Sequence, residues 1–405
     1  MKRPKHSDCR RLASVALLWS TLSCGLRAEE EPIHEPPRLL PAVPSVYLRV
    51  PYGTGAQAGT LSPEAPSAAL TQVAPNSVFD STVPTRLPAV QGAVARVSEL
   101  WLVSTRRLPR AGDSVVAPTF APDVSRYVWG QGWMPSSLEE FLGTSTNEAI
   151  TTVFVHGNDT TAEDALRGGC GLFSQLLGNA AAPAPLARFV IWSWPNESTT
   201  LRVRKSAQAN AGRVNMEGFL LAEFLERVAQ RSPTSVVGYS SGAGVATGAL
   251  HALGGGALDG RVLATLPCDE RNSINAVLLG AAMPNDWLLP GRPHERAVSQ
   301  AERLVMTVNP TDAVLRWYPF LWGRNGPAAL GATGIAQLAP LGPDQAKIAQ
   351  PNLEAALQTR HGWRYYSGSP EVIALLRREM LEHPAVRVGR NVASRRSAGA
   401  PQVPR

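Results

Sequence analysis

The sequence places a serine between two glycines where an apolar segment ends. Gly238-Tyr239-Ser240-Ser241-Gly242 matches G-x-S-x-G, the pattern of a sharp strand-to-helix turn that exposes the serine hydroxyl. Glycine suits positions 238 and 242, because side chains there would collide with the adjoining strand and helix. The five-residue pattern is common by composition, but an apolar segment precedes it and a segment rich in small residues follows it. We therefore predict that Ser240 is a nucleophile.

A serine hydroxyl attacks effectively only when a histidine takes its proton and an acid orients that histidine. We predict His361 as the base, because it lies in a loop directly before the last helix. His251, His294 and His383 are the alternatives. For the acid we predict Asp312, which follows the apolar segment 303–308. Asp286, one segment earlier, is the alternative, and Asp312 would also suit the N-cap of a helix over 313–318.

A third element would bind the negative oxygen of the tetrahedral intermediate. His156-Gly157-Asn158 follows an apolar segment, so its backbone can turn an N–H group toward Ser240. We expect the N–H groups of Ser241 and Asn158 to form this oxyanion hole, with that of Asp159 as the alternative to Asn158. Each such donor contributes about 3 to 4 kcal/mol to catalysis. We also expect Tyr239 and Trp317 to contact the substrate, and the connections 283–300 and 318–350 to cover the site.

The elements that must position these residues alternate between strands and helices. Near-continuous apolar segments typical of buried parallel strands span 149–155, 187–194, 235–239, 274–282 and 303–308. Earlier strands are expected over 99–105 and 123–129, and helices over 136–142, 215–230 and 241–253. This alternation predicts an α/β fold, a doubly wound and mostly parallel sheet in one main domain. Loops at the C-terminal ends of its strands would carry the site.

Several of these segments together resemble a bacterial α/β-hydrolase family of unknown substrate. They are Val155-His-Gly-Asn158, Trp192-Ser-Trp-Pro195, the Ser240 motif, Asn309-Pro-Thr-Asp312 and His361. The resemblance covers about residues 99–381 and implies the α/β-hydrolase fold with Ser240, Asp312 and His361 as its triad. Many members of that family carry His before the nucleophile and Met after it, where this chain has Tyr239 and Ser241.

The N-terminus has the pattern of a secretory signal peptide over residues 1–28. Lys2 to Arg11 is basic, Leu12 to Leu26 is uncharged and apolar, and three glutamates follow at 29–31. An uncleaved anchor is an alternative, as is lipidation of Cys24, so the expected location is periplasmic, outer-membrane-anchored or extracellular. Outside the cytoplasm, Cys170 and Cys268 would be able to pair. A tether rich in proline and alanine follows at 29–96, then the α/β-hydrolase domain at 97–388 and a disordered basic tail at 389–405.

The charge distribution argues against nucleic acid as a partner. The net charge is +7, but residues 1–28 and 387–405 each carry +5, which leaves −3 for the 358 residues between them. A nucleic-acid-binding domain needs its basic residues on a folded face. The sequence therefore predicts an exported serine hydrolase that cleaves a small carboxylic ester and needs no cofactor or metal. Amide hydrolysis and acyl transfer would use the same triad. The alternative of another class is a catalytically silent domain that binds ligands at the cell surface.

Overall fold

Nine strands form one mixed, mostly parallel sheet in the computed structural model. The structure describes residues 98–108, 120–145, 149–177, 187–196, 203–264, 271–323 and 325–382. The predicted signal peptide, tether and basic tail lie outside these residues, as do Cys24, Cys268 and His383. Cys170 is a free thiol.

The sheet has the strand order β11-β10-β9-β6-β4-β5-β1-β2-β3. The strands from β11 to β1 in this order run parallel, whereas β2 pairs antiparallel with both β1 and β3. The strands are β1 (Ser98–Ser104), β2 (Asp123–Val128), β3 (Gly132–Ser136), β4 (Ile150–Val155), β5 (Ala187–Ser193), β6 (Thr234–Tyr239), β9 (Ile274–Leu279), β10 (Arg303–Met306) and β11 (Ile348–Ala349). A separate antiparallel pair joins β7 (Ala257–Leu258) and β8 (Arg261–Val262).

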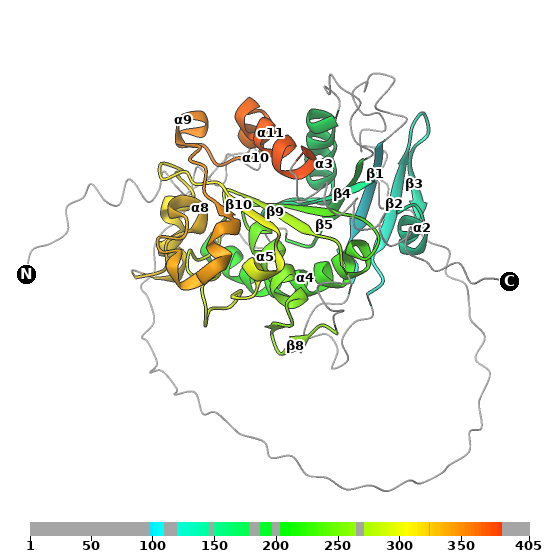
Figure 1. Cartoon of the computed structure of the whole chain (residues 1–405). Helices are drawn as coiled ribbons and strands as arrows, with labels where there is room; N and C mark the ends of the chain where they lie inside the picture. The colour runs from blue at the N-terminus through cyan, green and yellow to red at the C-terminus, as the bar shows by residue number, and fades with distance from the viewer. Residues whose placement is uncertain are drawn as a thin grey trace, which may run out of the picture. The chain divides into compact units, whose positions relative to one another are not determined.

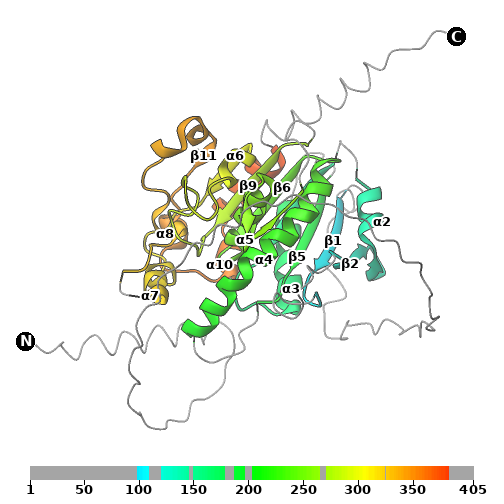
Figure 2. The ribbon, with the colours of Figure 1, turned by 90° about the horizontal axis from the view of Figure 1, so that it is seen from below.

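Helices cover both faces of this sheet. Helices α3 (Ala162–Leu177), α10 (Trp363–Ser367) and α11 (Pro370–Arg377) pack together on one face, which is the upper one in Figure 1. Helices α4 (Val203–Ala229) and α5 (Gly242–Leu253) pack together on the other, and Figure 2 shows them in front of the sheet. The shorter helical segments are α2 (Leu138–Gly143), α6 (Ala297–Gln300), η3 (Leu315–Trp317), α7 (Tyr318–Trp322), α8 (Leu330–Thr333), η4 (Ala339–Lys347), α9 (Glu354–Leu357) and η5 (Arg378–Glu382).

The central strands are buried on both faces, as their apolar sequences predict. Every residue of β4, β5, β6 and β9 is buried. Helix α5 is buried along its whole length, which explains why it consists mainly of Gly, Ala, Val and Leu. The expected α/β class and the mostly parallel sheet are confirmed. Among the described residues, no helix has the length and apolarity needed to cross a bilayer.

Some boundaries differ from the expectation for local reasons. Helix α4 begins at Val203 rather than at residue 215, because its first turns are rich in Ala, Arg, Lys and Gln, which favour a helix without apolar periodicity. Helix α2 is capped by Ser137, whose Oγ accepts from the Glu140 N–H at 3.1 Å. The helix was expected to start at residue 136, but Ser136 is the last residue of β3. The short strands β3 and β11 were not expected.

Candidate active site

Ser240 occupies a tight turn between β6 and α5. Its φ of +54° lies in the left-handed region that non-glycine residues rarely adopt. A Cβ atom at Gly238 would lie 2.6 Å from the Gly242 carbonyl oxygen, and one at Gly242 would collide with the carbonyl oxygens of Val155 and His156. Glycine at these two positions thus lets β6, α5 and the end of β4 meet closely, and the Ser240 hydroxyl stands at the N-terminus of α5.

Ser240, His361 and Asp312 form one continuous chain of hydrogen bonds. The Ser240 Oγ lies 3.0 Å from His361 Nε2, and His361 Nδ1 lies 2.8 Å from Asp312 Oδ2. Asp312 is fully buried and Ser240 is 7% exposed. The structure therefore brings together the three residues that the sequence singled out, although 72 residues separate Ser240 from Asp312 and 49 separate Asp312 from His361.

The two oxygens of the Asp312 carboxylate have different partners. Oδ2 faces His361, while Oδ1 accepts from the backbone N–H groups of Val314 and Leu315 at 2.9 and 3.0 Å. The carboxylate thus caps the turn before η3 and orients the imidazole at the same time. A side chain fixed by two backbone donors holds its second oxygen in one position, which favours one orientation of the histidine ring.

Backbone contacts hold the Asp312 loop against the His361 loop. The Ala313 N–H donates to the Thr359 carbonyl at 3.1 Å, and the Asn309 side-chain amide donates to the Gln358 carbonyl at 2.7 Å. Asp312 follows β10 and His361 precedes α10, so these contacts fix the Asp312 carboxylate relative to the His361 imidazole.

Two tyrosines enclose the His361 imidazole. The Tyr239 ring lies 5.6 Å and the Tyr366 ring 6.3 Å from it, centroid to centroid. The Tyr239 hydroxyl donates to the His361 carbonyl at 2.6 Å, so this residue, predicted to contact substrate, also positions the base. Burial and the nearby Asp312 charge raise the pKa of both tyrosines above the ordinary value, which keeps both hydroxyls protonated.

The predicted oxyanion loop lies beside Ser240, and hydrogen bonds to polar side chains packed against it fix its position. His156 Nε2 accepts from the Trp194 N–H at 3.1 Å, and its Nδ1 lies 2.9 Å from the Gly157 carbonyl. Arg106 donates to the Thr160 carbonyl at 2.8 Å. Burial, with the Arg106 charge adding to it, lowers the pKa of His156 to about 3. His156 is therefore neutral and structural.

Both residues of the predicted oxyanion hole line a cavity together with Ser240. Ser241 is the N-cap residue of α5. Asn158 lines the cavities next to Ser240. The N–H of Asp159, the alternative to Asn158, already donates to the Asn196 carbonyl at 3.2 Å, so Asp159 does not serve as a donor here.

The alternative acid and base lie away from Ser240. His294 is fully buried and its Nδ1 lies 2.9 Å from the Thr247 hydroxyl, with a pKa lowered to about 3, first by burial. His251 receives the Arg296 N–H at 3.3 Å. Asp286 pairs with Arg292 at 3.3 Å. His383 lies outside the described residues.

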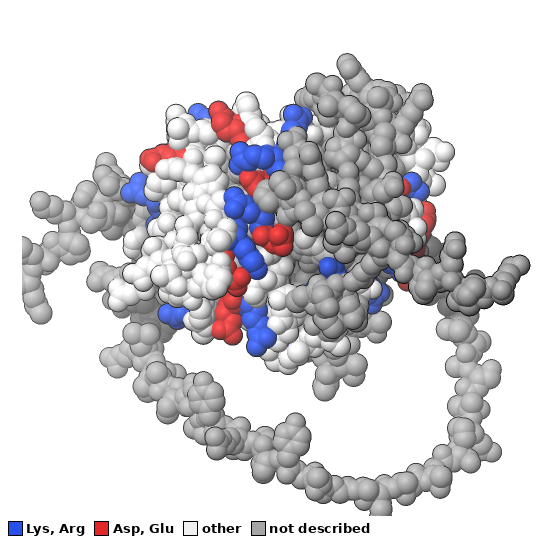
Figure 3. Space-filling model, viewed as in Figure 1, with Lys and Arg blue, Asp and Glu red and all other residues white. Residues whose placement is uncertain are grey.

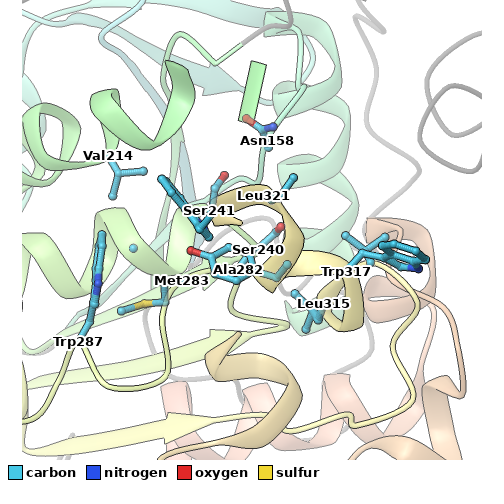
Figure 4. Close-up of a pocket in the computed structure, with 14 residues that line it drawn as sticks. Asn158, Val214, Ser240, Ser241, Ala282, Met283, Trp287, Leu315, Trp317 and Leu321 are labelled. Carbon is cyan, nitrogen blue, oxygen red and sulfur yellow. The ribbon is translucent and has the colours of Figure 1, made fainter. Parts of the chain in front are cut away.

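Two cavities open on either side of Ser240. The first has a volume of about 80 Å³ and is lined mainly by apolar side chains, including Met283, Trp287, Trp317 and Leu321. In the view of Figure 4, Trp287 and Trp317 lie on opposite sides of Ser240 and Ser241. The expected connections 283–300 and 318–350 both contribute to this lining. The second cavity is a wider groove of about 620 Å³ with polar and charged walls.

Sequence reasoning missed several residues that shape the site. Tyr366, Arg106 and Asn196 carry no motif of their own, and each reaches the site from an element whose position depends on the folded sheet. Trp363 was signalled by its position two residues after His361, and it lines the second cavity. Among the described residues, no group of three or more His, Cys, Asp and Glu side chains is placed to hold a metal ion.

The chain is an α/β protein with a nine-stranded, mixed and mostly parallel sheet. Neither the scan against protein-family models nor the search of curated proteins finds a match. What the molecule does must therefore be argued from the site itself.

Proposed function

We propose that this protein is an exported serine hydrolase of the α/β-hydrolase fold that cleaves a carboxylic ester through an acyl-enzyme. The observation that carries the proposal is the chain of hydrogen bonds from Asp312 through His361 to the Ser240 hydroxyl. The strained strand–turn–helix setting of Ser240 and the chain order Ser, Asp, His support the α/β-hydrolase assignment.

In the first half-reaction, Ser240 Oγ attacks the ester carbonyl carbon while its proton passes to His361 Nε2. The tetrahedral oxygen takes up negative charge and is bound by the Ser241 and Asn158 N–H groups. The bond from carbon to the alcohol oxygen then breaks, and His361 gives its proton to that oxygen. Asp312 holds the ring orientation and stabilises the charged imidazole.

In the second half-reaction, water replaces the alcohol. His361 takes a proton from the water molecule, whose oxygen attacks the acyl carbon. The bond from that carbon to Ser240 Oγ breaks, the proton returns to Ser240, and the carboxylic acid leaves. The same residues would serve amide hydrolysis or acyl transfer.

Charge on the visible surface also suits a small-molecule substrate. On the described part of the face in Figure 3, Lys and Arg lie interspersed with Asp and Glu rather than in a uniform basic patch. Export remains part of the proposal because of the basic and apolar pattern of residues 1–28. Mass spectrometry of the N-terminal peptide of the mature protein tests export, because it locates the cleavage site. A lipid at Cys24 would add a defined mass to that peptide.

A fluorophosphonate probe tests the proposed activity directly. We expect the purified protein to be labelled at Ser240 and to hydrolyse p-nitrophenyl esters, and Ser240→Ala to lose both properties. Ser174→Ala is the matched control, because Ser174 Oγ donates within α3 and lines neither cavity. A folded protein that takes up no label would instead favour a catalytically silent binding domain. A label that persists in Ser240→Ala would place the reactive group elsewhere and overturn the assignment of Ser240.

A further inference from the structure

The two cavities differ in chemistry and meet at Ser240. Among the residues that the structure describes, only Asn158, Ser240 and Val314 line both of them. The smaller cavity is walled by aliphatic and aromatic side chains, whereas acidic and basic side chains and threonine hydroxyls face the larger groove. A substrate whose carbonyl carbon sits on Ser240 therefore has two unlike spaces for its two ends.

The position of His361 decides which end enters which space. His361 lines the groove and not the apolar cavity. Because the imidazole must protonate the departing alcohol oxygen, that oxygen has to lie on the groove side of Ser240. The carbonyl oxygen faces the Ser241 and Asn158 N–H groups, which leaves the apolar cavity for the acyl chain.

We propose that the substrate is an ester of an apolar carboxylic acid with a bulky, uncharged, hydroxyl-rich alcohol. The acyl chain occupies the cavity walled by Met283, Trp287 and Leu321, and the alcohol occupies the groove. This inference rests on the proposed function and names the substrate class of the same site.

The groove walls fit a neutral polyhydroxyl group better than a charged one. Asp159 and Asp164 are balanced there by Arg167 and Arg364. Arg167 is already paired with Asp164 at 2.9 Å, so the groove presents no excess of either charge. These groups offer donors and acceptors to hydroxyls.

Flat ring surfaces complete the groove. Tyr239 and Trp363 line it with their ring centroids 5.0 Å apart, and such rings combine apolar faces with polar edges. Apolar faces beside hydrogen-bonding groups match the alternating C–H and O–H surface of a sugar ring. The larger volume of the groove accommodates an alcohol bulkier than the acyl group.

One variant in each cavity separates the two subsites. Gly171, on the groove face of α3, has open space around the position of a Cβ atom, so Gly171→Leu narrows the groove without a clash. Its control is Gly212→Leu, a helical glycine that also has open space and lines neither cavity. In α7, Leu321→Trp fills the apolar cavity. Phe320→Trp is its control, because Phe320 is 53% exposed and outside both cavities.

The probes are methyl butanoate, methyl octanoate, 6-O-butanoylglucose and 6-O-octanoylglucose, each scored by kcat/KM. For the unmodified protein we expect the glucose esters to be preferred at least tenfold over the methyl esters. Octanoyl should exceed butanoyl, with up to about fourfold per methylene group until the cavity is full. Leu321→Trp should lower the octanoyl preference at least tenfold and keep the glucose preference. Gly171→Leu should lower the glucose preference at least tenfold and keep the octanoyl preference.

The outcomes distinguish this inference from the proposed function. If Ser240 still takes up fluorophosphonate but glucose esters are not preferred, or if Leu321→Trp alters the alcohol preference instead, the subsite assignment is overturned while the hydrolase stands. If Ser240 of the unmodified protein takes up no fluorophosphonate, the proposed hydrolase function is overturned, and this inference fails with it. Should Leu321→Trp fail to fold, Leu321→Phe adds less volume and carries the same expectation.

Discussion

Two hydrogen-bonded carboxylates, Glu99 and Asp312, have opposite surroundings. Glu99, on β1, accepts from Arg126 at 2.8 Å, from Arg188 at 3.3 Å and from the Trp101 indole at 3.0 Å. Arg188 is itself 1% exposed and also donates to the Phe141 carbonyl. All three of these partners are donors, and none of Arg126, Arg188 and Trp101 lines either of the two cavities.

Asp312 begins a chain of a different kind. Its Oδ2 faces the His361 imidazole, and the series of hydrogen bonds ends at the Ser240 hydroxyl between two cavities. Both carboxylates are hydrogen-bonded, so hydrogen bonding alone does not mark a site. The two clusters differ in whether their hydrogen bonds lead to a group that a ligand can reach. Four predictions test this difference.

The largest effect is expected at the acid of the triad. Asp312→Asn keeps the cap of η3 but places an amide beside His361, which disturbs the tautomer that the base needs. We expect kcat to fall about 10⁴-fold with little change in the melting temperature. Asp286→Asn is the matched control, because that carboxylate pairs with Arg292 on the surface side of the loop. A loss of activity in the control alone would move the acid to Asp286.

The reverse pattern is expected at Glu99. Glu99→Gln keeps the size of the side chain but leaves the buried Arg188 guanidinium without an anion. Breaking a buried pair costs about 3 to 5 kcal/mol, and the Glu99 side chain is 23% exposed, so we expect a loss near the lower end. Denaturant unfolding measures it. Fluorophosphonate labelling of Ser240 below the transition should stay unchanged, and slower labelling would mean that the two clusters are coupled.

A smaller effect on catalysis is expected from the residue that supports the oxyanion loop. His156→Gln loses one of the contacts that tie this loop to Trp194 and Gly157. A displaced donor stabilises the oxyanion less, so we expect kcat to fall about tenfold to a hundredfold, less than for loss of a donor outright. KM for p-nitrophenyl butyrate should change little. A rise in KM with constant kcat would assign His156 to substrate binding instead.

The smallest effect concerns a third carboxylate, that of Glu217, which is 4% exposed. It accepts from the Thr105 hydroxyl at 2.8 Å, and burial raises its pKa to about 7 despite the charges of Arg106 and Arg213. The folded state therefore binds this proton more tightly than the unfolded state, whose carboxyl titrates near 4.5. The stabilisation is complete below pH 4.5 and is lost as the pH rises to about 7.

Glu217→Gln removes this titration and keeps the neutral form of the side chain. We expect the unfolding free energy of the unmodified protein, relative to Glu217→Gln, to fall by about 2 kcal/mol between pH 5 and 7.5. Urea unfolding across this range measures it, with the exposed Glu139→Gln as control. A difference that does not vary with pH would show that Glu217 is charged in the folded protein.

The sequence predicted the central strands because residues buried on both faces must be apolar throughout, as in β4, β6 and β9. It predicted Ser240 because the turn restricts which residues fit at 238 and 242. The short strands β3 and β11 escaped prediction, since two to five residues give too little pattern. The start of α4 also escaped, because its polar turns lack periodicity.

By itself, the sequence determined the class of fold and a short set of residues able to do the chemistry. These follow from local physics, namely which side chains tolerate burial and which fit a strained turn. Only the tertiary structure decided that Asp312 rather than Asp286 contacts His361. It also decided that the Asp159 N–H donates to the Asn196 carbonyl. It also decided that the space around Ser240 divides into an apolar and a polar part. Such facts depend on contacts between residues far apart in the chain, and the order of residues along the chain does not specify the distances between them.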